Sequence, residues 1–276
     1  MSKPQVWTWE PNSNSGKPLF ALCQKGVAFD YHYINMTDFE HHSPEYLARN
    51  PAGTLPTMEH DGKLFTESTP MCEYIDATWP GHGPRMVPDD PLARYRMRAI
   101  GRRITSYAGA LSVIGWHNFV GPMARSKTPE ERERIIARIP TKERRIAWQT
   151  AMNATFTEEQ LAGARAAVGK GVMEMEALLK ETPFLAGPSY TIADLESFAN
   201  FYSLPMTVPE YANKEAAPRY IDWLIRIYNI DGTMAAFGLA RSLARRAFKI
   251  KEELEAGRQP VQVTLEDVQR QAAANG

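Results

Sequence analysis

The amino-acid sequence predicts a chain of two domains, a small α/β domain followed by an all-helical domain. Strand and helix patterns alternate in the first part, in the order βαβ, then α, then ββα. The composition changes after Trp79, where proline and glycine become frequent, and from Leu92 onward almost every pattern is helical. The first part therefore predicts a mixed four-stranded sheet covered by helices, within the usual size of a small domain.

Each element of the α/β domain follows from a local pattern. Strands are predicted where apolar and polar residues alternate, and helices where apolar residues recur every three or four positions. Gly26 ends the first helix, Asp61-Gly62 forms a hairpin turn, and Ser68 is predicted to cap the last helix. The predicted elements are a strand at 6–9, a helix at 17–25, a strand at 29–36, a helix at 44–49, strands at 56–60 and 63–66, and a helix at 68–79.

The remainder of the chain is predicted to be helical. One long helical pattern runs over residues 92–116. Capping boxes open three further helices, at Thr128, Thr157 and Thr191, and an aromatic-rich helix covers residues 218–228. We predict a first domain at 1–84, a linker at 85–92, a helical domain at 93–250, and a charged, loosely held tail at 251–276.

The composition excludes several classes of function. Lysine plus arginine and aspartate plus glutamate both number 32, so the formal net charge is zero, which argues against nucleic acid as the main partner. No apolar run approaches the length of a membrane span, and the N-terminus lacks a signal peptide's apolar core. Two cysteines are too few for a disulfide framework. We therefore expect a soluble cytoplasmic protein.

A loop and hairpin at residues 50–70 predict a binding site for a short peptide. Pro56 forces Leu55 towards an extended backbone, and a cis Leu55-Pro56 bond would turn the loop so that it presents the Leu55 backbone. An extended backbone can pair with another peptide. Glu67 and Ser68 add a carboxylate and a hydroxyl at the mouth of a helix. From spacing alone, an ordinary hairpin that contains a proline is an equally good interpretation.

Three motifs together resemble the glutathione S-transferase superfamily. They are Asn50-Pro-x-Gly53-x-Leu55-Pro56, Glu67-Ser68 and Tyr190-Thr-Ile-Ala-Asp194. The resemblance implies a glutathione transferase fold, in which a thioredoxin-like, glutathione-binding domain precedes a helical bundle. It also implies dimerisation.

A narrower set of motifs is similar to the bacterial glutathione-dependent β-aryl etherases, which degrade lignin fragments. The similarity covers most of residues 5–235, includes the long middle of the helical domain around residues 128–155, and fades in the tail. The motifs are Asn14-Ser15-x-Lys17-Pro18, His60-Asp-Gly62-Lys63, Thr66-Glu-Ser-Thr69, Ile114-Gly-Trp116, and Trp148 with Asn153 and Phe156.

The resemblance implies catalytic roles for Asn14 and Ser15. Glutathione reacts as a thiolate, and an ordinary thiol is only a few per cent ionised at pH 7. Lowering its pKa by ~2 units requires about 2.7 kcal/mol of stabilisation of the anion. The Ser15 hydroxyl, the Asn14 amide and the start of the first helix can supply it together. The alternative is that Ser15 is only a helix cap.

The same resemblance implies which residues of the first domain contact the other parts of glutathione. The backbone of Leu55, before Pro56, would pair with its cysteinyl part. Glu67 would take the ammonium of the γ-glutamyl end, and Ser68 with its helix N-terminus the carboxylate. His41 or His42 would lie near the glycyl carboxylate, although both could equally be solvated loop histidines.

The implied reaction is displacement of a phenolate from an aryl-ether ketone by glutathione, with no metal. Tyr107, Trp116, His117 and Trp148 are the candidates for an aromatic substrate pocket, and packing in the core is the alternative for each. Two other functions remain open: a glutathione-dependent disulfide reductase or thioether lyase, and a non-catalytic subunit that stabilises a related chain. The dimer could be a homodimer or a heterodimer with such a chain.

Three further features are assigned structural roles. We expect Cys23 and Cys72 to be small core residues, although Cys72 lies in the first turn of a helix, where a lowered pKa is conceivable. The paired arginines of the helical domain, Arg144-Arg145 among them, are expected on solvated faces or in dimer contacts.

Overall fold

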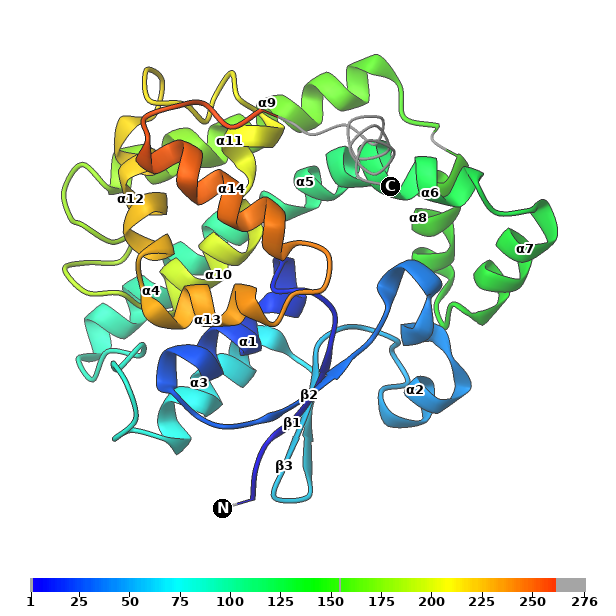
Figure 1. Cartoon of the computed structure of the whole chain (residues 1–276), viewed down its shortest axis with the longest axis horizontal. Coiled ribbons are helices and arrows are strands. Elements are labelled where there is room, and N and C mark those ends of the chain that lie inside the picture. The colour runs from blue at the N-terminus through cyan, green and yellow to red at the C-terminus, as the bar shows by residue number, and fades with distance from the viewer. Residues whose placement is uncertain (1, 154, 262–276) are drawn as a thin grey trace, which may run out of the picture.

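The computed structural model describes residues 2–153 and 155–261 of the chain. It confirms the predicted fold class, a thioredoxin-like domain followed by a helical domain (Figure 1). The first domain consists of β1 (Gln5–Thr8), α1 (Ser13–Lys25), β2 (Asp30–Tyr33), the 3₁₀ turns η1 (Met36–Asp38) and η2 (Glu40–His42), α2 (Pro44–Arg49), β3 (Thr57–His60), β4 (Lys63–Phe65) and α3 (Ser68–Thr78).

The four strands form one mixed sheet in the order β2-β1-β3-β4. β1 is parallel to β2 and antiparallel to β3, and β3 is antiparallel to β4. Successive side chains of β1 point to opposite faces of the sheet. Val6 and Thr8 are buried in the core, whereas Trp7 stacks on His32 and lies under the Arg49 guanidinium of α2.

The helical domain has more and shorter helices than its sequence pattern predicts. It contains α4 (Pro91–Thr105), α5 (Ala108–Gly115), the π-helical turn η3 (Trp116–Val120), α6 (Gly121–Arg125), α7 (Pro129–Arg138), α8 (Lys142–Asn153), α9 (Glu158–Leu178), α10 (Ile192–Phe201), α11 (Leu204–Thr207), α12 (Pro218–Tyr228), α13 (Asp231–Gly238) and α14 (Ala244–Glu255). The three predicted capping boxes are all present.

The prediction of a single helix over residues 92–116 is wrong, because the helix is interrupted at Ser106 and Tyr107, between α4 and α5. The Thr105 and Ser106 hydroxyls donate to the carbonyls of Gly101 and Arg103, at 2.8 and 2.6 Å. Hydroxyls that hydrogen-bond to the preceding turn in this way commonly bend a helix. Tyr107 then turns its ring against Gly171 of α9.

The start of the first helix also differs from the predicted one. α1 begins at Ser13, so Asn14 and Ser15 lie in its first turn. The predicted boundary at residue 250 falls within α14, whose Leu254 is buried. Residues 262–276 of the predicted tail lie outside the described residues.

One hydrophobic core joins the two domains. α1 packs against α3 of its own domain and against α10 and α13 of the helical domain. Gly232 lets α13 approach closely, since a Cβ there would come within 2.7 Å of the Gln24 backbone. A smaller cluster surrounds Trp148, where α6, α7 and α8 (residues 121–153, hereafter the arm) reach the segment around Phe39 (Figure 1).

Candidate functional site

The sheet topology brings the predicted glutathione residues to one edge. The parallel strands β1 and β2 end at the same edge, and antiparallel pairing places the start of β3 and the end of β4 there too. From this edge emerge the segments 9–16, 34–56 and 66–68. Every site residue predicted in the first domain belongs to one of these three segments.

Asn14 and Ser15 lie in the first turn of α1. The Thr8 hydroxyl at the end of β1 donates to the Ser15 carbonyl at 2.9 Å, which ties this turn to the sheet. Ser15 is buried and Asn14 is exposed. Among the described residues, neither the Ser15 hydroxyl nor the Asn14 amide has a hydrogen-bond partner, so both can serve a ligand.

The Leu55–Pro56 peptide bond is cis, the form in which the sequence predicts that the loop presents the Leu55 backbone. Leu55 is half-buried, and its N–H and C=O make no hydrogen bond within the described part of the chain. The preceding carbonyl, of Thr54, accepts from the Tyr46 hydroxyl at 2.6 Å and the Asn50 amide at 3.0 Å. The loop is therefore held from one side and leaves the Leu55 backbone available for pairing.

Glu67 and Ser68 occupy the start of α3, but not as predicted. α3 begins at Ser68, so Glu67 holds the N-cap position, and neither forms a side-chain cap. The prediction that Ser68 caps this helix is therefore wrong. Glu67 is exposed and Ser68 half-buried.

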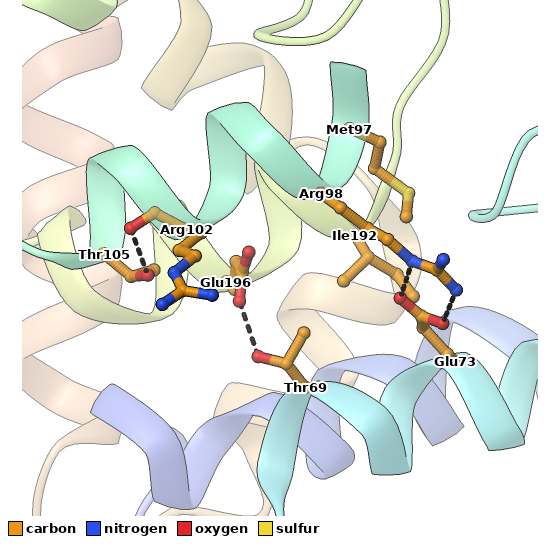
Figure 2. A pocket seen from close by; sticks show the side chains of 8 residues that line it. All are labelled: Thr69, Glu73, Met97, Arg98, Arg102, Thr105, Ile192 and Glu196. Atoms are coloured by element: carbon orange, nitrogen blue, oxygen red, sulfur yellow. Dashed lines mark hydrogen bonds and ion pairs between the residues drawn. The ribbon is translucent and has the colours of Figure 1, made fainter. Parts of the chain in front are cut away.

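A buried polar contact links the starts of α1 and α3. Lys17 donates to Thr69 at 3.0 Å and forms an ion pair with Glu196 of α10 at 3.2 Å. Gly101 makes room for Glu196, since a Cβ there would lie 1.9 Å from Oε1. A cavity of about 250 Å³ lies beside this contact, between α3, α4 and α10. Figure 2 shows its lining, with the Arg102 side chain directed toward Glu196.

His41 and His42 are buried, which overturns their interpretation as solvated loop histidines. Their ring centroids are 3.9 Å apart. His41 Nδ1 and both ring nitrogens of His42 are buried without a hydrogen-bond partner in the described chain. Burial, together with the neighbouring His42 and Arg144, lowers the pKa of His41 to about 3. Burial and Arg144 lower the pKa of His42 to about 4. Both imidazoles are therefore neutral at pH 7.

Two of the four predicted substrate residues join these histidines. The rings of Trp116 and Trp148 stack with centroids 6.0 Å apart, and Trp148 lies 4.9 Å from Phe39 and 6.2 Å from His41. Trp148 is buried and Trp116 half-buried. The structure thus assembles an aromatic cluster from η2, η3 and α8.

Among the described residues, the other two predicted substrate residues, Tyr107 and His117, make no ring contact with this aromatic cluster. The Tyr107 hydroxyl donates to Glu174 at 3.0 Å and its ring packs on α9 at the edge of the main core, so the structure does not bring it into the aromatic cluster. His117 follows Trp116 in η3, is half-buried, and has a buried Nδ1 without a partner in the described chain.

Neither cysteine has the environment of a reactive thiol. Cys72 is fully buried, as expected of a core residue, and burial raises the pKa of its thiol. Cys23 is half-buried at the edge of the core, and burial raises its thiol pKa to about 12. Among the described residues, no group of His, Cys, Asp and Glu is arranged to hold a metal ion. No described helix is long and apolar enough to cross a membrane.

Sequence reasoning missed two residues at this site. Glu10 is buried in the segment that leads from β1 to Ser15, and it accepts hydrogen bonds from the backbone N–H groups of residues 241–243. Arg144 is not on a solvated face, because it is half-buried, its charge acts on His41 and His42, and it donates to the Ala52 carbonyl. Their partners are far away in the sequence, so local patterns give no signal for either.

Comparison with known proteins identifies the family and the fold of the chain. A family model described as the glutathione S-transferase N-terminal domain matches residues 13–78. Protein LigF of Sphingobium sp. (strain NBRC 103272 / SYK-6) is 33% identical over 228 residues, which cover 81% of this chain and 88% of LigF. The crystal structure of beta-etherase LigF from Sphingobium sp. strain SYK-6 matches with a TM-score of 0.79 and 30% identity, over 90% of this chain and 99% of that one.

A more distant structure shows the fold alone. The theta class glutathione S-transferase of Xanthomonas axonopodis pv. citri, solved with glutathione bound, matches with a TM-score of 0.64 and 20% identity, over 86% of this chain and 97% of that one. The similarity to LigF extends over most of both chains at more than 30% identity. This chain therefore belongs to the glutathione S-transferase superfamily.

Proposed function

We propose that this protein is a glutathione transferase that cleaves β-aryl ether bonds of lignin-derived aromatic ketones, giving a glutathione thioether and a phenol. The family implies glutathione as cosubstrate. The observation that carries the finer proposal is the stacked pair Trp116 and Trp148, which the helical domain holds against the loop of His41 and His42. An aromatic substrate suits an apolar pocket of this kind.

In this proposal Asn14 and Ser15 activate the thiol of glutathione. The Ser15 hydroxyl and the Asn14 amide donate hydrogen bonds to the glutathione sulfur, and the first turn of α1 adds the positive end of a helix. Together these groups need to favour the thiolate by about 2.7 kcal/mol to lower its pKa by ~2 units.

The other segments at the sheet edge hold glutathione in place. The Leu55 backbone, preceding Pro56, pairs with the cysteinyl part. Glu67 takes the ammonium and the start of α3 at Ser68 takes the carboxylate of the γ-glutamyl end. The imidazoles of His41 and His42 face the glycyl end. These roles position the sulfur, and no metal is needed for them.

The reaction is a displacement at the carbon between the ketone and the ether oxygen. A carbon–sulfur bond forms and the carbon–oxygen bond breaks, and its electron pair leaves with the phenolate. The adjacent carbonyl activates this carbon, and phenols, with pKa ~10, are tolerable leaving groups. Trp116 and Trp148 orient the aromatic rings, and His117 could protonate the leaving oxygen. Tyr107, engaged with Glu174, is the weakest member of the proposed pocket.

The proposal is tested by incubating the purified protein with glutathione and each enantiomer of an aryl-ether ketone. Release of phenol and a glutathione thioether is the expected result, and release from neither enantiomer would refute the activity of the isolated chain. Turnover only of a disulfide or a glutathione thioether would favour the reductase or lyase instead. Binding without any turnover would favour a stabilising subunit.

Ser15→Ala and Asn14→Ala test the thiolate partners. Each removes one hydrogen bond to an anion, so kcat/KM should fall about tenfold to hundredfold. The free energy of unfolding should change little, as a urea titration would show. Ser112→Ala, on the exposed face of α5, is the control. Unchanged turnover in both site variants would remove these residues from the mechanism.

The assembly and location of the protein are also proposals. We propose a dimer, either of two copies or with a related transferase chain, because the family typically dimerises and α4 exposes the large side chains Leu92 and Tyr95. We propose a cytoplasmic location, where glutathione is reduced. Light scattering of the purified chain would show whether it dimerises alone.

A further inference from the structure

Arg144 is a half-buried cation for which the described chain provides no anion. Its Nη1 donates to the Ala52 carbonyl, and no carboxylate among the described residues forms an ion pair with it. Burial lowers the pKa of its guanidinium. Buried or half-buried arginines are usually paired with a carboxylate or phosphate, whose planar oxygens match the guanidinium fork.

The surroundings of Arg144 offer further groups to an anion. Its charge is close enough to His41 and His42 to disfavour their protonation, and three of their buried ring nitrogens have no partner in the described chain. The ring of His42 packs on Gly53, where a Cβ would lie 2.9 Å from Cδ2. Gly53 and Ala52 belong to the loop that presents Leu55. The cluster of Arg144, His41 and His42 therefore borders the proposed glutathione site.

Arg144 and Trp148 share one face of α8, because residues four positions apart on a helix are neighbours. Trp148 in turn stacks on Trp116 and contacts Phe39. An anion that binds Arg144 would therefore hold the arm, and with it the aromatic cluster, against the first domain.

We propose that Arg144 completes a carboxylate site with His41 and His42, and that this site takes the glycyl carboxylate of glutathione. The inference rests on the proposed function and deepens it. Glutathione then bridges the first domain and the arm, so the cosubstrate binds first and builds the pocket for the aromatic substrate. Arg144 is a binding residue for glutathione and, through Trp148, a positioning residue for the ether.

The test compares glutathione with its glycyl monoethyl ester, which lacks the negative charge at that end. Calorimetry should show wild-type protein binding glutathione about tenfold to hundredfold more tightly than the ester, the range for hydrogen bonds to a charged group. Arg144→Gln should bind glutathione about tenfold to hundredfold more weakly than the wild type does, and its affinity for the ester should be unchanged. Arg144→Lys, which keeps the charge without the fork, should recover part of the lost affinity for glutathione.

Arg145→Gln is the matched control. Arg145 is the next residue of α8 and donates to Ile139 within the arm, so its replacement should leave the preference for glutathione unchanged. Binding of glutathione should also change the tryptophan fluorescence of the wild type, and Trp148→Phe should diminish that change while calorimetric binding persists.

The outcomes separate this inference from the proposed function. Equal affinity of the unaltered protein for glutathione and its ester would overturn the carboxylate site, whatever the activity. An equal loss for both ligands in Arg144→Gln would overturn the role of Arg144. A strong preference for glutathione without phenol release would sustain the site and refute only the ether cleavage.

Discussion

Glu10 shows how one buried side chain can join the loop of the proposed catalytic residues to the far end of the chain. Its carboxylate accepts N–H bonds from Arg241 at 3.1 Å and Ser242 at 3.0 Å, and hydroxyl bonds from Ser242 at 2.9 Å and Tyr33 at 3.1 Å. Burial, followed by the charge of Glu10, raises the pKa of Tyr33 to about 12. The carboxylate thus anchors the segment that leads into α14.

Glu10→Gln should therefore destabilise the protein. The amide keeps the shape of the side chain, but it loses the charge and directs an N–H₂ group towards N–H donors. Hydrogen bonds to charged groups are worth about 1.5–3 kcal/mol, so we expect a loss of about 2–3 kcal/mol in the free energy of unfolding, measured with urea. Glu45→Gln, on the exposed side of α2, is the control. A loss no larger than that of the control would mean that the anchor contributes little.

For single residues, the sequence predicted only the features that short sequence motifs determine. Leu55 and Ser68 belong to local patterns whose geometry depends on neighbouring residues, so the loop before Pro56 and the helix that begins at Ser68 could be predicted. The backbone N–H partners of Glu10 lie more than 230 residues away, and Ala52, the partner of Arg144, lies 92 residues away. No local pattern specifies such pairs, because only tertiary packing brings them together.

The contact between the arm and η2 contains two histidines whose protonation depends on pH. The His41 ring lies 6.2 Å from that of Trp148 and 3.9 Å from that of His42, and the pKa values of the two histidines are lowered from 6.5 to about 3 and about 4 by burial and by the charge of Arg144. In the unfolded chain both titrate near 6.5. Between these values the unfolded state binds more protons, so the free energy of unfolding rises with pH and is lost on acidification.

Acidification from pH 6.5 to about 4 should weaken the fold. The loss approaches at most about 1.4 kcal/mol per pH unit for each histidine. Urea titrations at several pH values would measure it, and the double variant His41→Gln/His42→Gln should show a flatter dependence. His82→Gln, in an exposed loop, should leave the slope unchanged. If the double variant and the wild type had equal slopes, the two histidines would not be responsible.

Helix existence was predictable where a cap and a periodic apolar stripe coincide. α12 was predicted with its observed bounds, and Thr157 opens α9 with the predicted capping box. The break after Thr105 was missed because the apolar pattern continues across it. At the break, the Thr105 and Ser106 hydroxyls bond to the preceding turn and Tyr107 contacts α9, and the apolar periodicity carries no signal of these contacts.

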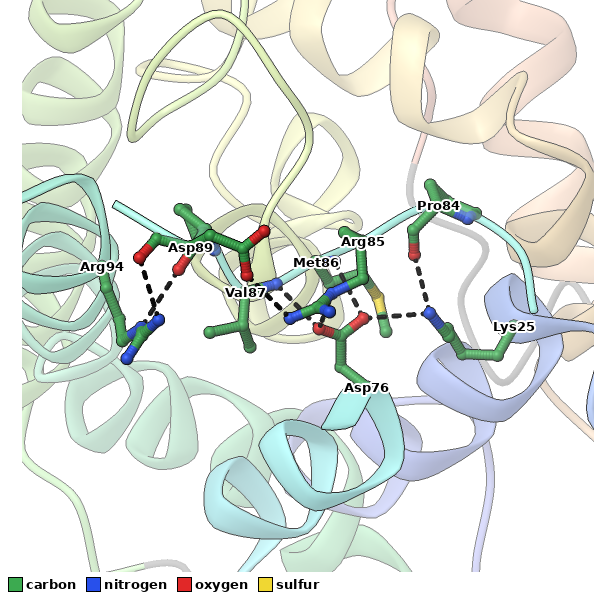
Figure 3. A network of polar contacts seen from close by, with 9 residues as sticks. Lys25, Asp76, Pro84, Arg85, Met86, Val87, Asp89 and Arg94 are labelled. Atoms are coloured by element: carbon green, nitrogen blue, oxygen red, sulfur yellow. Dashed lines mark hydrogen bonds and ion pairs between the residues drawn. The ribbon is translucent and has the colours of Figure 1, made fainter. Parts of the chain in front are cut away.

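The whole molecule is held together at the linker as well as in the core. Asp76, near the end of α3, accepts from Lys25 at 3.1 Å and from the backbone N–H groups of Met86 and Val87 at 2.9 and 3.1 Å (Figure 3). Lys25 also donates to the Pro84 carbonyl at 3.1 Å. The Lys25 and Asp76 side chains are both fully buried. The chain that connects the domains is thereby fastened to two helices of the first domain.

Asp76→Asn should destabilise both domains at once. The amide cannot balance the buried Lys25 charge, and breaking a buried ion pair from one side costs about 3–5 kcal/mol. Because one core spans α1, α10 and α13, the protein should still unfold in a single transition at lower urea, seen alike by far-UV circular dichroism and tryptophan fluorescence. Asp89→Asn removes an exposed partner of Arg85 and should change the free energy of unfolding by less than about 0.5 kcal/mol. Two separate transitions in Asp76→Asn would mean that the linker, and not the shared core, couples the domains.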